Sequence, residues 1–147
     1  MFKHILVATD GTKLSDKAIK TAIALAKSSG ARVTGFYAAA EYKTPYYPEG
    51  AFYEWPSPAD YKKSVGQAAE KLLKKVTKLA SEEHVAAEVA YAFNDHPHQA
   101  IINHARKVKA DLIVMSSHGR RAISSLLMGS ETQKVLALSK LPVLVVR

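Results

Sequence analysis

The chain has 147 residues, 48% of them hydrophobic and 23% charged, which is the balance of an ordinary globular domain, and its length fits one domain over residues 1–147. It contains no cysteine, which excludes disulfides, thiolate catalysis, iron–sulfur clusters and cysteine-based zinc sites. The formal net charge of +8 could attract nucleic acid, anionic lipid or phosphorylated small molecules. Without a signal-peptide pattern or a run of roughly 20 apolar residues, we expect a cytoplasmic protein with no membrane partner.

The first third of the chain predicts a strand, a helix and a second strand. Residues 4–9 form a near-continuous apolar run that ends at Asp10 and Gly11, which indicates a strand buried on both faces and then a turn. The following helix has apolar residues at three- and four-residue spacing and ends at Gly30. Residues 32–38 are the expected second strand.

An irregular segment at about residues 40–57 interrupts this alternation. Prolines, a glycine and five aromatic residues gather in it: Pro45, Tyr46, Tyr47, Pro48, Gly50, Phe52, Tyr53, Trp55 and Pro56. This composition is typical of a loop or lid, which could cover a site or contact a partner. Ser57 and Pro58 then predict the start of a helix that runs to about Glu83, with a solvated lysine-rich face. Its expected apolar stripe is Val65, Ala69, Leu72, Val76 and Leu79.

The remainder of the chain continues the alternation of strands and helices. We expect a strand at residues 86–93, a helix at 97–109, a strand at 111–116 and a last strand at 141–146. Ser130 and Gln133 match a capping box, which predicts Ser130 as the N-cap of a helix. His96 and His98 suggest a metal site, but no nearby carboxylate or third histidine at helical spacing completes it, so we expect capping or exposed roles for them.

This order of elements predicts an α/β fold, a doubly wound parallel sheet with helices on both faces and right-handed crossovers. Ligands on such sheets bind at the carboxyl ends of the strands. The chemically distinctive loops follow the first and fourth strands, so they would form one site if those strands are neighbours.

The loop after the fourth strand has the composition of an anion-binding site. Gly119 can present backbone amides to an anion, Gly129 permits a close backbone approach, and Ser130 lies at the positive end of the next helix. Arg120 and Arg121 could clamp phosphates or be ordinary exposed arginines. The alternative is that the two glycines only make turns.

The spacing of Gly119, nine residues, Gly129 and Ser130 resembles that of the universal stress protein family, whose nucleotide-binding members carry Gly, two residues, Gly, nine residues, Gly, then Ser or Thr. The resemblance covers the whole chain, from the strand that ends at Asp10 to the closing Val146. Ser116 stands in place of the first glycine of that pattern. If the site needs a positive φ there, a Cβ would cost on the order of 1–2 kcal/mol.

The resemblance implies the strand order 3-2-1-4-5, a Rossmann-like sheet of the adenine nucleotide alpha hydrolase-like kind, and a homodimer through the edge strand Val143–Val146. It also implies a site for ATP, ADP or AMP formed by Thr9, Asp10, Val33, Met115, Ser116, His118, Gly119, Arg120, Gly129, Ser130 and Thr132. Asp10 could accept from a ribose hydroxyl or hold Mg²⁺, or it could simply form the turn before Gly11.

The expected function is therefore nucleotide binding in a stress-response role. P-loop and dinucleotide-binding patterns are missing, and no acid partner for His118 is evident, so we expect binding with at most slow ATP hydrolysis, and no catalytic residues. One alternative is a dimeric interaction module of the same fold that holds no nucleotide. A weaker alternative is nucleic-acid binding through the basic surface.

Overall fold

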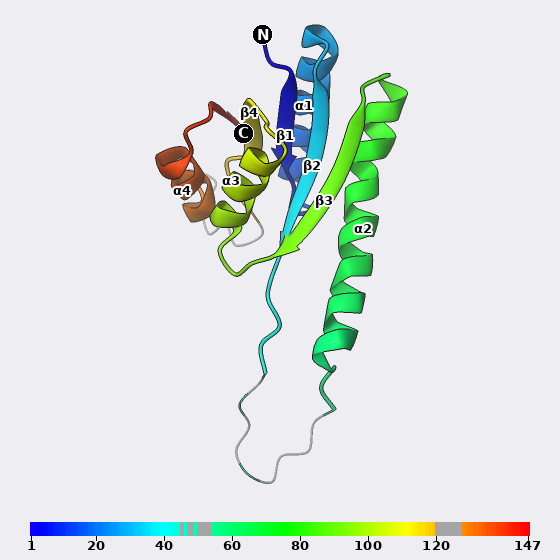
Figure 1. The fold of residues 1–147 in the computed structure, drawn as a ribbon, viewed down its shortest axis with the longest axis vertical. Helices are drawn as coiled ribbons and strands as arrows, with labels where there is room; N and C mark the ends of the chain where they lie inside the picture. The colour runs from blue at the N-terminus through cyan, green and yellow to red at the C-terminus, as the bar shows by residue number, and fades with distance from the viewer. Residues whose placement is uncertain (45, 47–48, 50–53, 120–127) are drawn as a thin grey trace.

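The computed structural model describes residues 1–44, 46, 49, 54–119 and 128–147, in which five strands and four helices alternate (Figure 1). The elements are β1 His4–Ala8, α1 Lys13–Ser29, β2 Arg32–Ala39, α2 Pro58–Glu82, β3 Ala87–Phe93, α3 Pro97–Lys107, β4 Leu112–Ser116, α4 Ser130–Leu138 and β5 Val143–Val146. Each predicted element is present, with ends that coincide with the prediction or shift by one or two residues.

All five strands are parallel and follow the order β3-β2-β1-β4-β5, which confirms the predicted doubly wound sheet. Ile5 of β1 lies opposite Val33 of β2 on one side and Leu112 of β4 on the other. Because β1 and β4 are neighbours and parallel, their carboxyl ends meet at the same edge of the sheet. The loops that follow them are therefore brought together.

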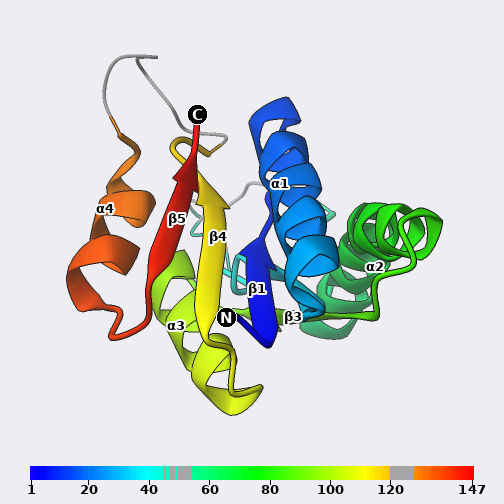
Figure 2. The same cartoon turned by 90° about the horizontal axis from the view of Figure 1, so that it is seen from above.

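Two hydrophobic clusters hold helices to the two faces of the sheet, since successive side chains of a strand point to opposite faces. On one face, Ile5 and Val7 pack against α1 and α2. On the other face, Leu6 and Phe36 pack against α3 and α4. Figure 2 shows the two pairs of helices on opposite sides of the strands.

The predicted stripe of α2 is confirmed at Ala69 and Val76, which are buried. It is wrong by one position elsewhere, because Leu73 and Ala80 are buried, whereas Leu72 and Leu79 are only partly buried. A Cβ at Gly35 of β2 would lie 2.8 Å from Val76 Cγ2. The bare glycine backbone lets Val76 approach the strand, and this contact sets which face of α2 meets the sheet.

The predicted capping box at the start of α4 is wrong. Gly129 is the N-cap, and Ser130 is the first helical residue. The Gly129 carbonyl accepts the first intrahelical bond, from Gln133 N at 3.1 Å, and the Gln133 side chain instead donates to Met128 O at 2.7 Å. Gly129 N also bonds to Ser117 O, so this tertiary contact fixes the turn at the glycine.

In the segment between β2 and α2, the described residues that follow β2 continue beyond the carboxyl edge of the sheet (Figure 1). Two bonds close its base: Tyr42 Oη donates to Pro56 O, and Tyr61 Oη donates to Ala40 O. In its described part this segment contains no helix or strand, as predicted. Several residues singled out from the sequence lie outside the described residues, namely Pro45, Tyr47, Pro48, Gly50, Phe52 and Tyr53. None of the helices in the described ranges is long and apolar enough to cross a membrane.

Candidate functional site

The loops after β1 and β4 meet at the carboxyl edge of the sheet. A Cβ built on Gly119 would lie 2.9 Å from Asp10 Oδ2, and Gly119 itself is exposed. The absence of a side chain at Gly119 therefore leaves room beside a carboxylate. This contact shows that the two distinctive loops lie together at one edge of the sheet.

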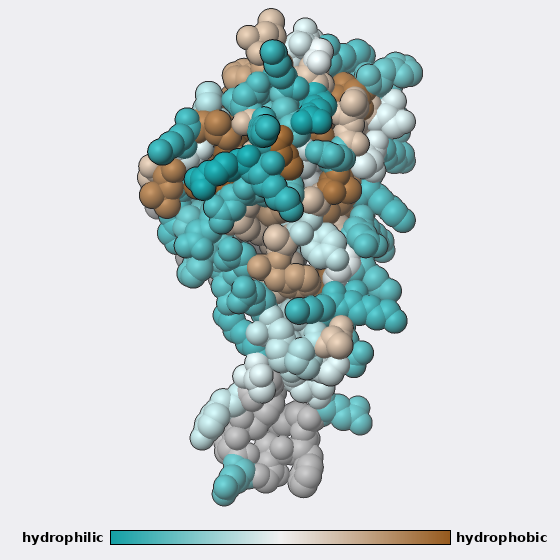
Figure 3. Space-filling view, viewed as in Figure 1, coloured by the Kyte–Doolittle hydropathy of each residue, from teal (hydrophilic) through white to brown (hydrophobic). Residues whose placement is uncertain are grey.

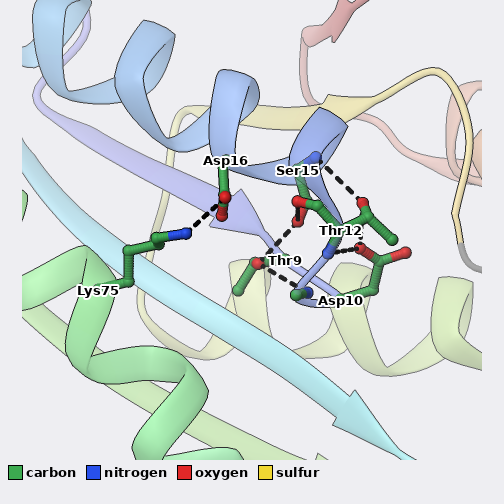
Figure 4. Close-up of polar contacts among 7 residues, drawn as sticks. Thr9, Asp10, Thr12, Ser15, Asp16 and Lys75 are labelled. Carbon is green, nitrogen blue, oxygen red and sulfur yellow. Dashed lines mark hydrogen bonds and ion pairs between the residues drawn. The ribbon is translucent and has the colours of Figure 1, made fainter.

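Asp10 organises the turn from β1 into α1 (Figure 4). Its Oδ1 accepts bonds from Thr12 N at 3.0 Å and Thr12 Oγ1 at 2.7 Å, and Thr12 Oγ1 in turn accepts from Ser15 N as the N-cap of α1. The turn-forming role left open by the sequence is thus present. Only Oδ1 takes part in it, and Oδ2 lies on the side of Gly119.

Thr9 holds the same turn from inside. Its hydroxyl is 3.1 Å from Ser15 Oγ and accepts from Gly11 N at 3.3 Å, and the residue is buried. Gly11 has a φ of 81°, a left-handed conformation that favours glycine. The Thr9 side chain therefore stabilises the loop and is already engaged within the protein.

Ser116 fits its position without strain. It is the last residue of β4, opposite Val146 of β5, and its Oγ donates to His118 O at 2.8 Å. Positive φ values outside glycine occur in the described part of the chain at His84 and Lys109, not at Ser116. The backbone penalty considered for a serine here therefore does not arise.

Gly129 packs directly on the β4 loop, as predicted. A Cβ on Gly129 would lie 3.3 Å from Ser117 O and 3.5 Å from the Cα of His118, and Gly129 N donates to Ser117 O at 2.7 Å. Thr132 Oγ1 donates to Ser116 O at 3.0 Å and is buried, so it ties the first turn of α4 to β4. Ser130 is exposed at the start of α4.

His118 contributes a buried polar atom to the loop. Its Nδ1 is 2.8 Å from Ser117 Oγ, whereas its Nε2 is buried without a hydrogen-bond partner among the described residues. Buried polar groups in proteins are nearly always paired. This nitrogen therefore has hydrogen-bonding capacity that the described residues do not fill.

Two predicted site residues lie elsewhere. Val33 is the second residue of β2 and fully buried beside Ile5, so it belongs to the amino end of the strands, opposite the site. The carboxyl end of β2, at Ala39, is the part of that strand on the site's edge. The Met115 side chain packs in the core with Ile101 and Val135. Arg120 and Arg121 lie outside the described residues.

The expected exposed role of His98 is also wrong. The residue is buried, and Glu131 Oε2 accepts bonds from both His98 N at 2.8 Å and His98 Nδ1 at 2.7 Å. Glu131 thereby caps α3, whose own N-cap His96 makes no side-chain cap bond. Burial raises the pKa of Glu131, but bonds from His98 and Lys134 outweigh it, so the net pKa is lowered.

Sequence reasoning missed this pair because the two residues are 33 positions apart, and neither has a distinctive local motif. It also missed Thr12 and Ser15, although Thr12 before an apolar helical run is an N-cap signal. Among the described residues, no group of three His, Cys, Asp or Glu side chains could hold a metal ion.

Comparison with known proteins shows consistent similarity over the whole chain. The model of the universal stress protein family matches residues 1–147. A universal stress protein of Thermus aquaticus is 36% identical over 147 residues, with 100% of both chains covered. The solved structure of MJ0577, a universal stress protein of Methanocaldococcus jannaschii, has a TM-score of 0.81 at 22% identity and covers 99% of this chain and 96% of its own. A universal stress protein solved in complex with cAMP has a TM-score of 0.73 at 25% identity, with 99% of this chain and 97% of that chain covered.

Proposed function

Because the chain belongs to the universal stress protein family, we propose that it binds ATP, or the related ADP or AMP, and acts in the cytoplasmic stress response. The observation that carries this proposal is the meeting of Asp10 Oδ2 with the side-chain-free Gly119 at the carboxyl edge of the sheet. A relative that is 25% identical was solved in complex with cAMP, which supports an adenine nucleotide as the ligand class.

The residues of the site suit the ribose and the phosphates of an adenine nucleotide. Asp10 Oδ2 would accept from a ribose hydroxyl or hold Mg²⁺ bound to the phosphates, since carboxylate and phosphate oxygens are the ligands Mg²⁺ prefers. The amide of Gly119 and the amino terminus of α4 at Ser130 would face the phosphates, because helix amino termini carry unpaired N–H groups and partial positive charge. His118 Nε2 would find a partner in the bound molecule.

Binding without turnover is the form of activity proposed. Phosphoryl transfer needs a positioned nucleophile and groups that stabilise developing charge. Asp10, the carboxylate of this site, already holds Thr12 through one oxygen. Any ATP hydrolysis is therefore expected to be slow.

A pair of substitutions at Gly129 tests the proposal. Gly129→Asn and Gly129→Asp add side chains of the same shape beside Ser117 and His118, but only Asp adds negative charge. By titration calorimetry with ATP and Mg²⁺, we expect Asn to weaken binding and Asp to weaken it at least ten-fold further. High salt should narrow the difference between the two variants. Thermal unfolding of both proteins checks that each is folded.

Equal affinities of the two variants for ATP would mean that the phosphates do not lie beside Gly129. If the wild type gives no heat of binding at millimolar ATP, the nucleotide proposal is wrong. The second candidate, an interaction module of the same fold without a nucleotide, would then stand. One observation favours it: the hydroxyls of Thr9, Ser116 and Thr132 all bond within the protein.

We also propose a homodimer through β5. This strand is an edge of the sheet, and Leu144 on it is 38% exposed. An apolar edge strand with free backbone groups favours pairing with a second strand.

A further inference from the structure

The hydroxyl of Ser116 holds the chain at the point where β4 leaves the sheet. Its Oγ donates to the carbonyl oxygen of His118 at 2.8 Å, and the residue is only 7% exposed. Because a hydroxyl carries a single proton, this bond uses the only donor of the side chain. Ser116 therefore has no proton left for a ligand, and its effect on the site passes through the His118 carbonyl.

The carbonyl that Ser116 holds belongs to the same peptide as the Gly119 N–H. This peptide is trans, so its C=O and its N–H point to opposite sides. Because glycine tolerates φ of either sign, a peptide that precedes glycine can turn over at low cost. The bond from Ser116 Oγ to His118 O opposes that rotation, and so it fixes the Gly119 N–H in a direction away from Ser116.

The Gly119 N–H is accessible to a ligand. Gly119 is exposed, and no described residue accepts a hydrogen bond from its N–H. A Cβ built on Gly129 would lie 3.8 Å from Gly119 N, so this amide lies beside the start of α4. Neither glycine places a side chain next to the donor.

The backbone around Ser116 is held by two neighbouring elements. Ser116 O accepts from Thr132 Oγ1 of α4 at 3.0 Å, and Ser117 N donates to Val146 O of β5 at 2.8 Å. Ser117 O accepts from Gly129 N at 2.7 Å. Because its backbone is fixed in this way, Ser116 offers a rigid attachment for the peptide between His118 and Gly119.

We propose that Ser116 is a positioning residue of the nucleotide site, whose hydroxyl holds the His118 carbonyl and so directs the Gly119 N–H at the phosphates. This proposal rests on the nucleotide binding proposed above, and it gives a role to the serine that replaces the first glycine of the family pattern. A donor that is oriented before the ligand arrives need not be ordered during binding. Ser116 acts through the peptide and does not itself touch the ligand.

The charge of the chain favours an anion at this donor. Hydrophilic residues cover most of the described surface on the face shown in Figure 3, and hydrophobic residues form smaller patches between them. The chain carries 21 Lys and Arg against 13 Asp and Glu, and such a net positive charge attracts phosphate compounds. ATP and adenosine share a base and a ribose but differ in the phosphates, so together they isolate the role of the amide.

Titration calorimetry of Ser116→Ala with ATP and with adenosine tests this role. Loss of the hydrogen bond should weaken ATP binding about three- to ten-fold, whereas the affinity for adenosine should change less than about two-fold. Ser116→Gly should weaken ATP binding at least as much, because it also frees the backbone. Ser29→Ala is the matched control, since Ser29 Oγ donates to Leu25 O at 2.8 Å at the far end of α1. This control should leave both affinities unchanged.

A measurement without ligand tests the orientation of the peptide itself. In nitrogen relaxation-dispersion NMR, the Gly119 amide of Ser116→Ala should show stronger exchange on the μs–ms timescale than the same amide of the wild type, because the released peptide can turn over. The Gly119 amide of Ser29→Ala should match the wild type. Thermal unfolding checks that each variant is folded.

Four results would overturn the proposal. They are unchanged exchange at Gly119 in Ser116→Ala, unchanged ATP affinity of that variant, equal losses of ATP and adenosine affinity, and tighter ATP binding by Ser116→Gly than by the wild type. The last result would mean that the serine obstructs the ligand. If the wild type binds no ATP at millimolar concentration, the proposed function is wrong and this proposal with it. ATP binding that is unchanged in Ser116→Ala contradicts this proposal alone.

Discussion

His4 lies buried at the start of β1 in a chain of hydrogen bonds that a neutral ring cannot complete. Its Nδ1 is 3.0 Å from Val108 O and must donate, since a carbonyl only accepts. Its Nε2 is 2.7 Å from Thr34 Oγ1, which also lies 3.1 Å from Glu88 Oε1. When His4 is neutral, the Thr34 hydroxyl donates its single proton to Nε2. The hydroxyl can donate to Glu88 only when Nε2 is protonated and itself donates to Thr34 Oγ1.

The burial of His4 and His104 outweighs this contact and predicts a loss of stability in mild acid. Burial and the nearby Arg32 lower the pKa of His4, and burial and Lys107 lower that of His104, which stacks on Phe36. Below the unfolded pKa of about 6.5, the unfolded chain binds more protons than the folded one. The stability from these two groups is thus complete above pH 6.5 and declines as pH falls through 6.5 toward their folded pKa values.

Urea unfolding at pH 7.5 and 5.5 measures this decline. The carboxylates with lowered pKa values lose their contribution only below about pH 4.5, outside this window. Glu88→Gln removes a charge that raises the pKa of both histidines, so the decline should steepen. His84→Asn, at an exposed residue with a φ of 57° that asparagine tolerates, should leave the decline unchanged. A flat profile in the wild type would contradict the prediction.

For single residues, the sequence predicts which side chains lie at the ends of strands and helices. The meeting of Asp10 with Gly119 follows from strand order alone. The pairing of His98 with Glu131 does not, because which face of α3 meets which face of α4 is decided by packing. Val33 was misplaced for a related reason: it begins its strand, and only the carboxyl ends of parallel strands reach the site.

Among the elements, the contact of α2 with β2 depends on a glycine. A Cβ at Gly35 would lie 2.8 and 2.9 Å from the methyl groups of Val76, which are held between helix and sheet. We expect Gly35→Ala to cost about 1–3 kcal/mol in urea unfolding through overpacking. At Gly66 of α2, a Cβ would meet the far end of the Tyr91 side chain, with the hydroxyl at 2.7 Å, and alanine favours helix by about 1 kcal/mol. Gly66→Ala should therefore cost much less. Equal losses would mean that Val76 can move aside.

The first turn of α3 depends on a carboxylate from another helix. Glu131→Ala leaves His98 N and Nδ1 without their acceptor, and we expect a loss of about 1–3 kcal/mol in thermal or urea unfolding. Lys134→Ala removes only the exposed partner of the same carboxylate and should cost less than about 1 kcal/mol. If both substitutions cost the same, the α3 cap would not be the origin of the effect.

The extent of each element was predictable because apolar periodicity and stop residues are local signals. The close approach of Val76 to the sheet and the true cap of α4 were not, because each depends on a residue of another element. Gly35 sets the first, and the Ser117 carbonyl sets the second.

For the whole molecule, the two edge strands of the sheet cannot both pair with copies of this chain. If copies of this chain paired at both β3 and β5, each copy would bind two others and the sheet would continue from copy to copy. Such an assembly grows into an open filament unless its symmetry closes it. β5 carries no charged residue, whereas β3 carries the carboxylate of Glu88, so β5 is the edge better suited to pairing with a copy. The family fold was predictable from element order and the Gly119–Gly129–Ser130 spacing.

Proline substitutions at the two edges separate the interfaces. Pro142 O and Val146 O accept bonds from Ile113 N and Ser117 N, so the alternation of the ladder turns the N–H of Val145 outward. Val145→Pro therefore removes a donor from the outer edge of β5 while the bonds to β4 remain. By sedimentation at micromolar concentration, we expect the wild type at about twice the 16.0 kDa chain mass and Val145→Pro as a monomer. Val89→Pro, in the opposite edge strand β3, should remain a dimer, since that edge does not join copies. A monomeric wild type would refute the dimer, and a monomeric Val89→Pro beside a dimeric Val145→Pro would move the interface to β3.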